Sequence, residues 1–143
     1  MTSQEKKQYL SQYLYICDEI EDLLHDLEEW YTIAGKVTAS YSGTPVGGSS
    51  DKLNSVVAKI LEIKDSCAER LERMEGLKHS IEQAVASVDE IELKRILRRR
   101  YIRGWNFQQI ADSLNYSYRQ VTRLHGIALR KVDENLLIRE NVS

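Results

Sequence analysis

The sequence is poor in the residues that interrupt helices, and it has no long apolar run. It contains one proline and one phenylalanine among 143 residues, whereas Glu, Lys, Leu and Ile are abundant. This composition predicts an all-α protein. No apolar run approaches the roughly 20 residues that span a bilayer, and the polar start MTSQEKKQ is unlike a secretory signal, so we expect no membrane partner and a cytoplasmic location.

The patterns typical of metal sites and enzymes are missing as well. Cys17 and Cys67 lie far apart without C-x-x-C spacing, and His25, His79 and His125 are scattered, so we expect no metal ion or cofactor. We interpret both cysteines as buried, reduced thiols. There is no glycine-rich phosphate loop, no nucleophile elbow and no recognisable pair of catalytic acids. We therefore expect no catalytic residues and no enzymatic activity.

The first part of the chain has the pattern of two long helices. Apolar residues alternate three and four positions apart over about residues 3–34, as on one face of a coiled-coil helix. A second such helix is predicted from Asp51, as its N-cap, to about Ser87. The segment between them, GKVTASYSGTPVGGSS at 35–50, is predicted to be a loop. The predicted apolar positions are Leu10, Tyr13, Cys17, Ile20, Leu24, Leu27 and Tyr31 on the first helix, and Leu53, Val56, Val57, Ile60, Ile63, Cys67, Leu71, Met74, Leu77, Ile81, Ala84, Val85 and Val88 on the second.

These two helices are expected to form a long antiparallel hairpin, coiled-coil-like and spanning residues 1–88. Its loop midpoint near Gly43 is almost equally far from Cys17 and Cys67, so the two thiols should lie at a similar height. Acidic residues cluster at 18–29, which fits either an ordinary solvated face or a docking surface. The hairpin is interpreted as a spacer, as a dimerisation element or as a docking arm for another protein.

A different pattern occupies residues 99–132, where two shorter helices are predicted with a tight turn between them. Ala111 is the small residue expected where the helices approach most closely, Asn115 suits a left-handed turn position, and Ser117 is a plausible N-cap for the second helix. This spacing predicts a helix-turn-helix, although an ordinary helical hairpin has a similar pattern. The expected inward-facing residues are Ile110, Leu114, Tyr116, Val121 and Leu124.

A further helix from Asp89 to Arg103 is predicted to begin this C-terminal domain, which we place at 89–143. Gly104 is expected to end that helix, and Trp105 to cover the core just beyond. The second helix of the pair is expected to run on past Val132 and to leave an exposed apolar strip for a partner helix or a dimer mate. Core positions are predicted at Ile91, Ile96, Leu97, Tyr101 and Ile102, and the strip at Leu136, Leu137 and Ile138.

Positive charge is concentrated in the same region. Residues 94–131 contain ten Lys or Arg and a single acid, Asp112, so the segment carries +9 while the whole chain carries −2. All other residues together therefore sum to −11. Such segregation on a weakly acidic protein is typical of a domain that binds phosphate groups of nucleic acid.

The C-terminal residues resemble region four of bacterial sigma factors, whose pattern is approximately LRY…G…EIA..LG.S…V…..ALRKL. The matching residues here are Arg100-Tyr101, Gly104, Ile110-Ala111, Leu114, Ser117, Val121 and Ala128-Leu129-Arg130-Lys131-Val132. The resemblance covers about a quarter of the chain. It implies a module that places its second helix in the DNA major groove and can also contact RNA polymerase.

Two further comparisons refine this resemblance. The sigma family carries an Arg-Glu-Arg…Arg-Gln type set at the start of the recognition helix, where this chain has Tyr118, Arg119, Gln120, Thr122 and Arg123, so recognition of the minus-thirty-five promoter element is not expected. The combination of GTP, GGSSDKLNSVVAKILEIKD and the sigma-like segment also resembles small phage and prophage proteins of Gram-positive bacteria described as late transcription regulators. That resemblance implies a regulator of phage gene expression.

The sequence thus predicts a DNA-binding transcription regulator with double-stranded DNA as partner and, through the sigma resemblance, RNA polymerase as a second. Two alternatives remain, a polymerase-binding adaptor with little DNA affinity and a packaging component of the small-terminase kind. Base contacts are expected from Tyr118, Arg119, Gln120, Thr122 and Arg123. Phosphate contacts are expected from Arg98, Arg99, Arg100, Arg103, Ser117, Arg130 and Lys131.

Overall fold

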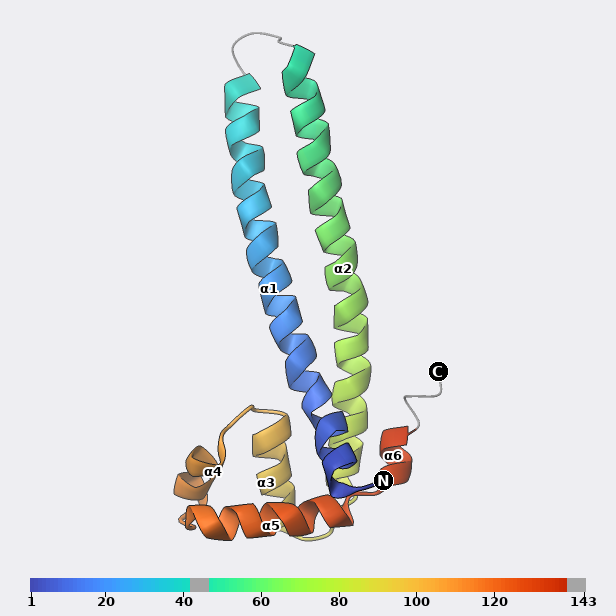
Figure 1. The fold of residues 1–143 in the computed structure, drawn as a ribbon, viewed down its shortest axis with the longest axis vertical. Helices are drawn as coiled ribbons and strands as arrows, with labels where there is room; N and C mark the ends of the chain where they lie inside the picture. Colours follow the sequence, from blue (N-terminus) through green and yellow to red (C-terminus); the bar gives the residue numbers. More distant parts are fainter. Residues whose placement is uncertain (42–46, 139–143) are drawn as a thin grey trace. The chain divides into compact units, whose positions relative to one another are not determined.

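A computed structural model describes residues 1–41 and 47–138, and these residues form six helices and no strand. The two long helices, α1 (Ser3–Tyr41) and α2 (Gly47–Ala86), lie side by side and run in opposite directions (Figure 1). The other helices are α3 (Ile91–Tyr101), α4 (Phe107–Leu114), α5 (Tyr118–Lys131) and α6 (Glu134–Ile138). The predicted all-α class and the pairing of two long helices are confirmed.

The long helices extend further into the predicted loop than the sequence suggests. α1 continues through Gly35 to Tyr41, and α2 already begins at Gly47, so Asp51 lies inside α2 and is not its N-cap. A glycine, serine or threonine in a helix costs at most about 1 kcal/mol relative to alanine, and packing readily outweighs that cost. Here Ala34 and Val37 continue the partly buried side of α1. Residues 42–46 of the predicted loop lie outside the described part of the chain.

The chain divides into two compact units, and the division crosses both long helices. Unit 1 comprises residues 1–16 and 74–143, and unit 2 comprises residues 17–73. The beginning of α1 and the end of α2 therefore belong to the same unit as α3–α6. This division lies at a different place from the boundary at 88/89 that the sequence suggests.

In unit 2 the contact between α1 and α2 uses Ile20 and Leu27 as predicted, but two of the other predicted α1 positions are wrong. Leu24 and Tyr31 are exposed, at 53% and 47%, whereas their neighbours Leu23 and Trp30 are partly buried. The side toward α2 is therefore formed by Ile20, Leu23, Leu27, Trp30, Ala34 and Val37, which are again spaced three and four apart. Because large apolar residues occupy both members of each neighbouring pair, the periodicity alone fits either choice.

The α2 side of unit 2 follows the prediction more closely. Val56, Ile60, Ile63 and Cys67 are buried, but Val57 and Leu71 are more than 40% exposed, contrary to the predicted apolar stripe. A stripe about 100° wide is enough to cover one neighbouring helix, so α2 has more apolar residues than α1 can cover. Cys67 is buried, Cys17 is half-buried, and both are free thiols.

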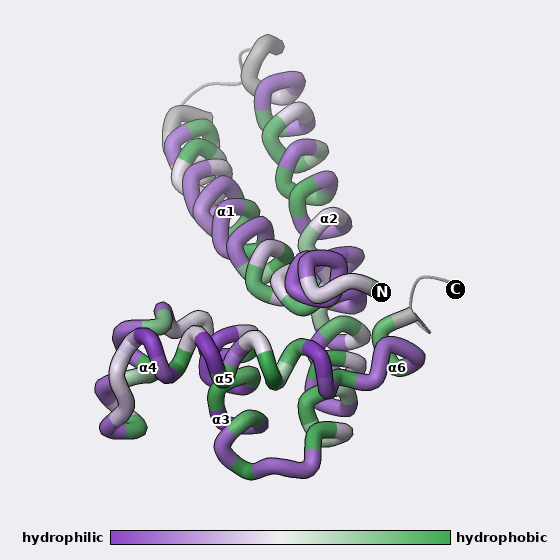
Figure 2. The backbone as a smooth tube through the Cα atoms, turned by 60° about the horizontal axis from the view of Figure 1, so that its bottom comes forward, coloured by the Kyte–Doolittle hydropathy of each residue, from purple (hydrophilic) through white to green (hydrophobic). Residues whose placement is uncertain are grey.

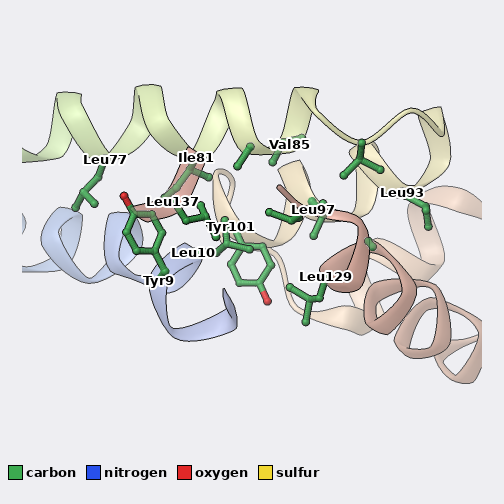
Figure 3. Close-up of a cluster of buried hydrophobic side chains, with 14 of the residues drawn as sticks. Tyr9, Leu10, Leu77, Ile81, Val85, Leu93, Leu97, Tyr101, Leu129 and Leu137 are labelled. Atoms are coloured by element: carbon green, nitrogen blue, oxygen red, sulfur yellow. The ribbon is translucent and has the colours of Figure 1, made fainter. Parts of the chain in front are cut away.

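Unit 1 has a continuous core to which α1, α2, α3, α5 and α6 all contribute (Figure 3). Leu10, Ile81, Leu97 and Leu137 are completely buried, and Tyr101 is 1% exposed. The hydroxyl groups of Tyr9 and Ser80 lie 3.2 Å apart and join α1 to α2 by a buried hydrogen bond. The core of unit 1 is therefore formed by the N-terminal part of α1 and the C-terminal part of α2 together with the short helices.

The end of unit 1 differs from the prediction of one long final helix. α5 stops at Lys131, Val132 adopts an extended conformation with ψ 130°, and α6 begins at Glu134. Leu137 is fully buried and Leu136 packs against the same core, so the predicted exposed strip does not exist at these positions. The break lets the chain turn back and bury the apolar residues that a continuous helix would leave in solvent.

Candidate nucleic-acid interface

The predicted interface lies on three short helices of unit 1 that share a small core. Ile96 of α3, Ile110 and Ala111 of α4, and Val121 of α5 are all completely buried and pack together. Trp105, Phe107, Leu114, Tyr116 and Leu124 are partly buried around them. The residues predicted to face inward are therefore buried or partly buried in this core, and Ala111 is fully buried among them. The prediction of Ile91 as a core residue is wrong, because Ile91 is 65% exposed at the first position of α3 while Leu93 is buried.

Local interactions specify where α3 ends and α4 begins. α3 ends at Tyr101 with Ile102 as its C-cap, slightly earlier than predicted, and Gly104 adopts the left-handed φ of +75° that turns the chain. Asn106 then begins α4 with a capping box: its side chain accepts from the Gln109 backbone N–H at 2.8 Å, and the Gln109 side chain accepts from the Asn106 N–H at 2.9 Å.

The turn between α4 and α5 has the predicted chemistry. Asn115 has φ 56° and ψ 39°, and it is the only non-glycine residue with positive φ among the described residues. The Ser117 hydroxyl accepts a hydrogen bond from the Gln120 backbone N–H at 3.1 Å and caps α5. These contacts set the point at which α5 starts, and so they determine which of its side chains point away from the core.

The exposed side of the first turns of α5 carries the predicted base-contacting residues. Ser117, Arg119, Gln120, Thr122 and Arg123 line one shallow depression of about 550 Å³. Arg119 and Arg123 are exposed, and among the described residues neither guanidinium has a hydrogen-bond or ion-pair partner. Two free guanidinium groups one turn apart on a helix are available to donate several hydrogen bonds to an external acceptor.

The other predicted base-contacting residues are more constrained. The Tyr118 ring is 53% exposed and makes an edge contact with Phe107, with ring centroids 6.2 Å apart, so it is held at the beginning of α5. The Thr122 hydroxyl donates to the Arg119 carbonyl oxygen at 2.9 Å. Its donor capacity is therefore used within α5, which leaves its methyl group as the part available to a partner.

Among the predicted phosphate-contacting residues, the α3 arginines are partly used by the fold itself. Arg98 pairs with Glu82 at 3.4 Å, and Arg99 donates to the Ser113 hydroxyl at 2.8 Å. Arg100 donates to the Trp105 carbonyl oxygen at 3.1 Å, and its guanidinium lies 4.5 Å from the centroid of the Phe107 ring. These residues position the α3–α4 segment in addition to supplying charge.

The remaining basic residues differ in how freely they can contact a partner. Arg103, like Arg99, lies 5.5 Å from the centroid of the Trp105 ring, so two guanidinium groups share one partly buried indole. Lys131 pairs with Glu90, and this ion pair lowers the pKa of the Glu90 carboxyl. Arg130 is exposed at the end of α5. The exposed ion pairs of Arg98 and Lys131 contribute little to stability, so both side chains can exchange their partner for a phosphate at small cost.

Beneath this surface, two polar side chains that the motif analysis did not single out as functional are buried together. The Tyr101 hydroxyl and His125 Nε2 lie 2.7 Å apart, joining α3 to α5. Burial lowers the pKa of His125 to about 4, with further contributions from the positive charges of Lys7 and Arg100. Burial also raises the pKa of Tyr101. Both groups are therefore neutral near neutral pH, and they form a buried polar contact between α3 and α5.

A buried lysine from the beginning of α1 holds the end of α5. Lys6 is 7% exposed, and its ammonium donates to the carbonyl oxygens of Val132 at 2.8 Å, Leu129 at 3.0 Å and Arg130 at 3.4 Å. These are carbonyls that a helix C-terminus leaves without partners, and a cation there also complements the helix dipole. Lys6 could not be singled out from the sequence, because it lies more than 120 residues from its acceptors and no local pattern marks it.

Comparisons with protein-family models, with curated proteins and with solved structures found no significant match for this chain. The resemblance to region four of sigma factors therefore rests on the motif residues quoted above. Within residues 1–41 and 47–138, no group of three or more His, Cys, Asp or Glu is arranged to hold a metal ion. In that same part of the chain, every helix is too short or too polar to cross a membrane.

Proposed function

We propose that this chain is a sequence-specific DNA-binding transcription regulator, in which α4, the Asn115 turn and α5 act as a helix-turn-helix. The exposed side of the first turns of α5 would enter the major groove. The observation that carries this proposal is the free, exposed pair Arg119 and Arg123 beside Gln120 on one depression of α5, in a segment of net charge +9. Arginine donates in bidentate fashion to guanine, and glutamine pairs with adenine, so these side chains suit base edges.

The flanking residues suit backbone contacts in the proposed complex. Arg99, Arg103 and Arg130 would supply charge to phosphates, and Arg98 and Lys131 would exchange their glutamate partners for phosphate. Ser117 at the start of α5 would contribute a hydroxyl beside a phosphate, at the helix end where backbone N–H groups favour anions. If about five phosphates are neutralised, log affinity should fall against log salt with a slope of about −4 to −5.

Selection of binding sequences from a random duplex library can identify the operator. With the full chain as the binding protein, the selection should enrich a discrete motif. Affinity for the enriched duplex and for an unenriched duplex is then measured across a salt series. A specific site should bind at least about a thousandfold more tightly than random DNA. Enrichment of nothing, with only weak and uniform binding, would contradict the proposal.

Replacement of Arg123 by alanine separates base contacts from phosphate contacts. Arg123→Ala should cost about 1–3 kcal/mol on the enriched duplex and much less on random DNA, because only the former offers the correct base. Arg130→Ala should weaken both complexes about equally. The matched control is Arg73→Ala, an exposed arginine in unit 2, which should change neither affinity. Equal losses on both duplexes for Arg123→Ala would make Arg123 a phosphate contact only.

The affinity measurements, together with the mass of the protein in solution, distinguish the two alternative functions. A polymerase-binding adaptor would show little DNA affinity even at low salt, although its helices remain folded by circular dichroism. A packaging component of the small-terminase kind would form rings of many subunits, which mass measurement in solution detects directly.

A further inference from the structure

The two broad sides of the helical hairpin in unit 2 differ in polarity: one carries exposed apolar residues and the other is charged. On α1, Leu24 and Tyr31 directly follow Leu23 and Trp30, which face α2. Leu24 and Tyr31 therefore lie roughly 90° around the helix from the contact with α2. On α2, residues 57, 61, 64, 68 and 71 are spaced four, three, four and three apart, and this second stripe also lies roughly 90° from the α1–α2 contact. Each long helix thus carries exposed apolar residues on one flank.

A contact between the helices shows that both stripes belong to the same side of the hairpin. The Lys64 ammonium lies 5.5 Å from the centroid of the Tyr31 ring. Since the α1 stripe contains Tyr31 and the α2 stripe contains Lys64, the two stripes lie next to each other. We call this surface the hairpin face, and its apolar members are Leu24, Tyr31, Val57, Leu61, Ala68 and Leu71.

The opposite side of the hairpin is charged. The Arg70–Glu19 ion pair, with 2.8 Å between Nε and Oε2, joins α2 to α1 there. Helical spacing places Asp22 and Asp26 of α1 and Lys59 of α2 on that side as well, with Ile33 as an exposed apolar residue at 39%. Figure 2 shows hydrophilic and hydrophobic segments alternating along both helices, as expected for helices with distinct sides. An ordinary solvated hairpin needs no second apolar stripe, whereas an adjoining apolar surface on two helices marks an interaction site.

We propose that the hairpin face binds the hairpin face of a second copy of this chain, forming a four-helix dimer. The area is adequate: residues 17–41 of α1 span about 37 Å, and two adjacent helices about 10 Å wide give roughly 750 Å² per copy. Stable protein interfaces bury about 800 Å² on each partner. A self-complementary surface of this kind is what a two-fold dimer requires.

Charge selects the orientation of the second copy. On the hairpin face, helical spacing places Glu21 and Glu28 of α1 beside Leu24 and Tyr31, whereas the charged residue of the α2 stripe is Lys64. A two-fold axis parallel to the helices places α1 on α2 of the partner, and an axis perpendicular to them places acidic α1 on acidic α1. The parallel axis is therefore favoured. It also keeps Lys64 at the height of the partner's Tyr31, within one turn of Glu28 of the partner subunit.

The test is the mass of the full chain in solution, measured without DNA by sedimentation equilibrium from about 1 to about 200 µM. The wild type should reach twice its chain mass of 16.6 kDa. Leu61→Glu should raise the dissociation constant at least about 30-fold, because it places a charge in the apolar contact. The matched control Ile33→Glu, the same kind of change on the opposite side, should leave it unchanged. Circular dichroism checks that each variant keeps its helices.

A charge exchange tests the orientation. Lys64→Glu should weaken the dimer, and the double variant Lys64→Glu with Glu28→Lys should restore it, since the two residues lie together across the proposed interface. A wild type that stays at 16.6 kDa, equal weakening by Ile33→Glu and Leu61→Glu, or a double variant no better than Lys64→Glu would each overturn the proposal. Because no DNA is present, these results are independent of whether the proposed DNA binding holds.

Discussion

The two units of this protein show that the number of helices packed together determines how completely their apolar side chains are buried. In unit 1, parts of all six helices pack together, and side chains such as Leu10, Ile81, Ile96 and Leu97 are completely buried. In unit 2, two helices meet along one seam, and even the best-buried side chains, Val56 and Ile63, keep 6% of their surface exposed. Two helices can cover only one stripe of each other, so unit 2 leaves apolar side chains in solvent. Unit 1 should therefore supply most of the free energy of unfolding. Unit 2 should supply most of the exposed apolar surface that can bind another chain.

The largest effect is expected from shortening a buried side chain, and the same kind of substitution can be compared in the two units. Leu97→Ala should lower the free energy of unfolding by about 2–5 kcal/mol, because it leaves a cavity in a fully enclosed core. Ile63→Ala should cost less, since the open seam of unit 2 can close or admit water. Denaturant unfolding gives the totals, and hydrogen exchange by mass spectrometry locates the loss. A larger loss for Ile63→Ala would reverse the comparison.

Acid should weaken unit 1 through His125. Its pKa is about 4 in the folded protein and about 6.5 in the unfolded chain, so the unfolded chain binds the proton first as the pH falls. Stability from neutral His125 is complete above about pH 6.5 and should decline by at most about 3 kcal/mol by about pH 4. In His125→Gln, which keeps a polar partner for Tyr101, this part of the pH dependence should disappear. Urea unfolding midpoints at several pH values measure it, and an unchanged profile in the variant would exclude His125 as the cause.

Lys6→Met tests how firmly the end of α5 is held within unit 1. The change keeps most of the aliphatic stem but removes the donor to three carbonyl oxygens, so it should cost about 1–3 kcal/mol. Lys7→Met, one residue further along α1, is the control and should cost less than about 0.5 kcal/mol. Amides near Val132 should lose exchange protection only in Lys6→Met. Equal effects of the two variants would show that the contact contributes no more than general surface charge.

The smallest expected effect is a gain in the stability of unit 2. Gly35 lies inside α1, and a Cβ added there meets nothing within 4 Å. Gly35→Ala should therefore stabilise α1 by about 0.5–1 kcal/mol through helix propensity alone. Thermal unfolding followed by circular dichroism, with hydrogen exchange to locate the gain in residues 17–41, measures it. A destabilised variant would mean that residue 35 is not helical in solution.

The local features of the candidate interface could be predicted from the sequence because short-range chemistry specifies them. Asn115 in a left-handed turn, Ser117 as a cap and the buried positions of Ala111 and Val121 all follow from spacing within one turn or two. The depression on α5 gathers Ser117, Arg119, Gln120, Thr122 and Arg123 for the same reason, since neighbouring positions on one helix face remain together in any tertiary arrangement.

Long-range choices could not be predicted in this way. Composition and periodicity determined that the chain is helical, that two long helices pair and where the short helices near Asn115 turn. Only the tertiary structure decided that Leu23 and Trp30, not Leu24 and Tyr31, face α2, that Leu137 is buried by a break after α5, and that Lys6 caps α5. The physical reason is that helix propensity and capping depend on residues a few positions apart. The burial of a side chain depends instead on which residues, far away in the sequence, pack against it.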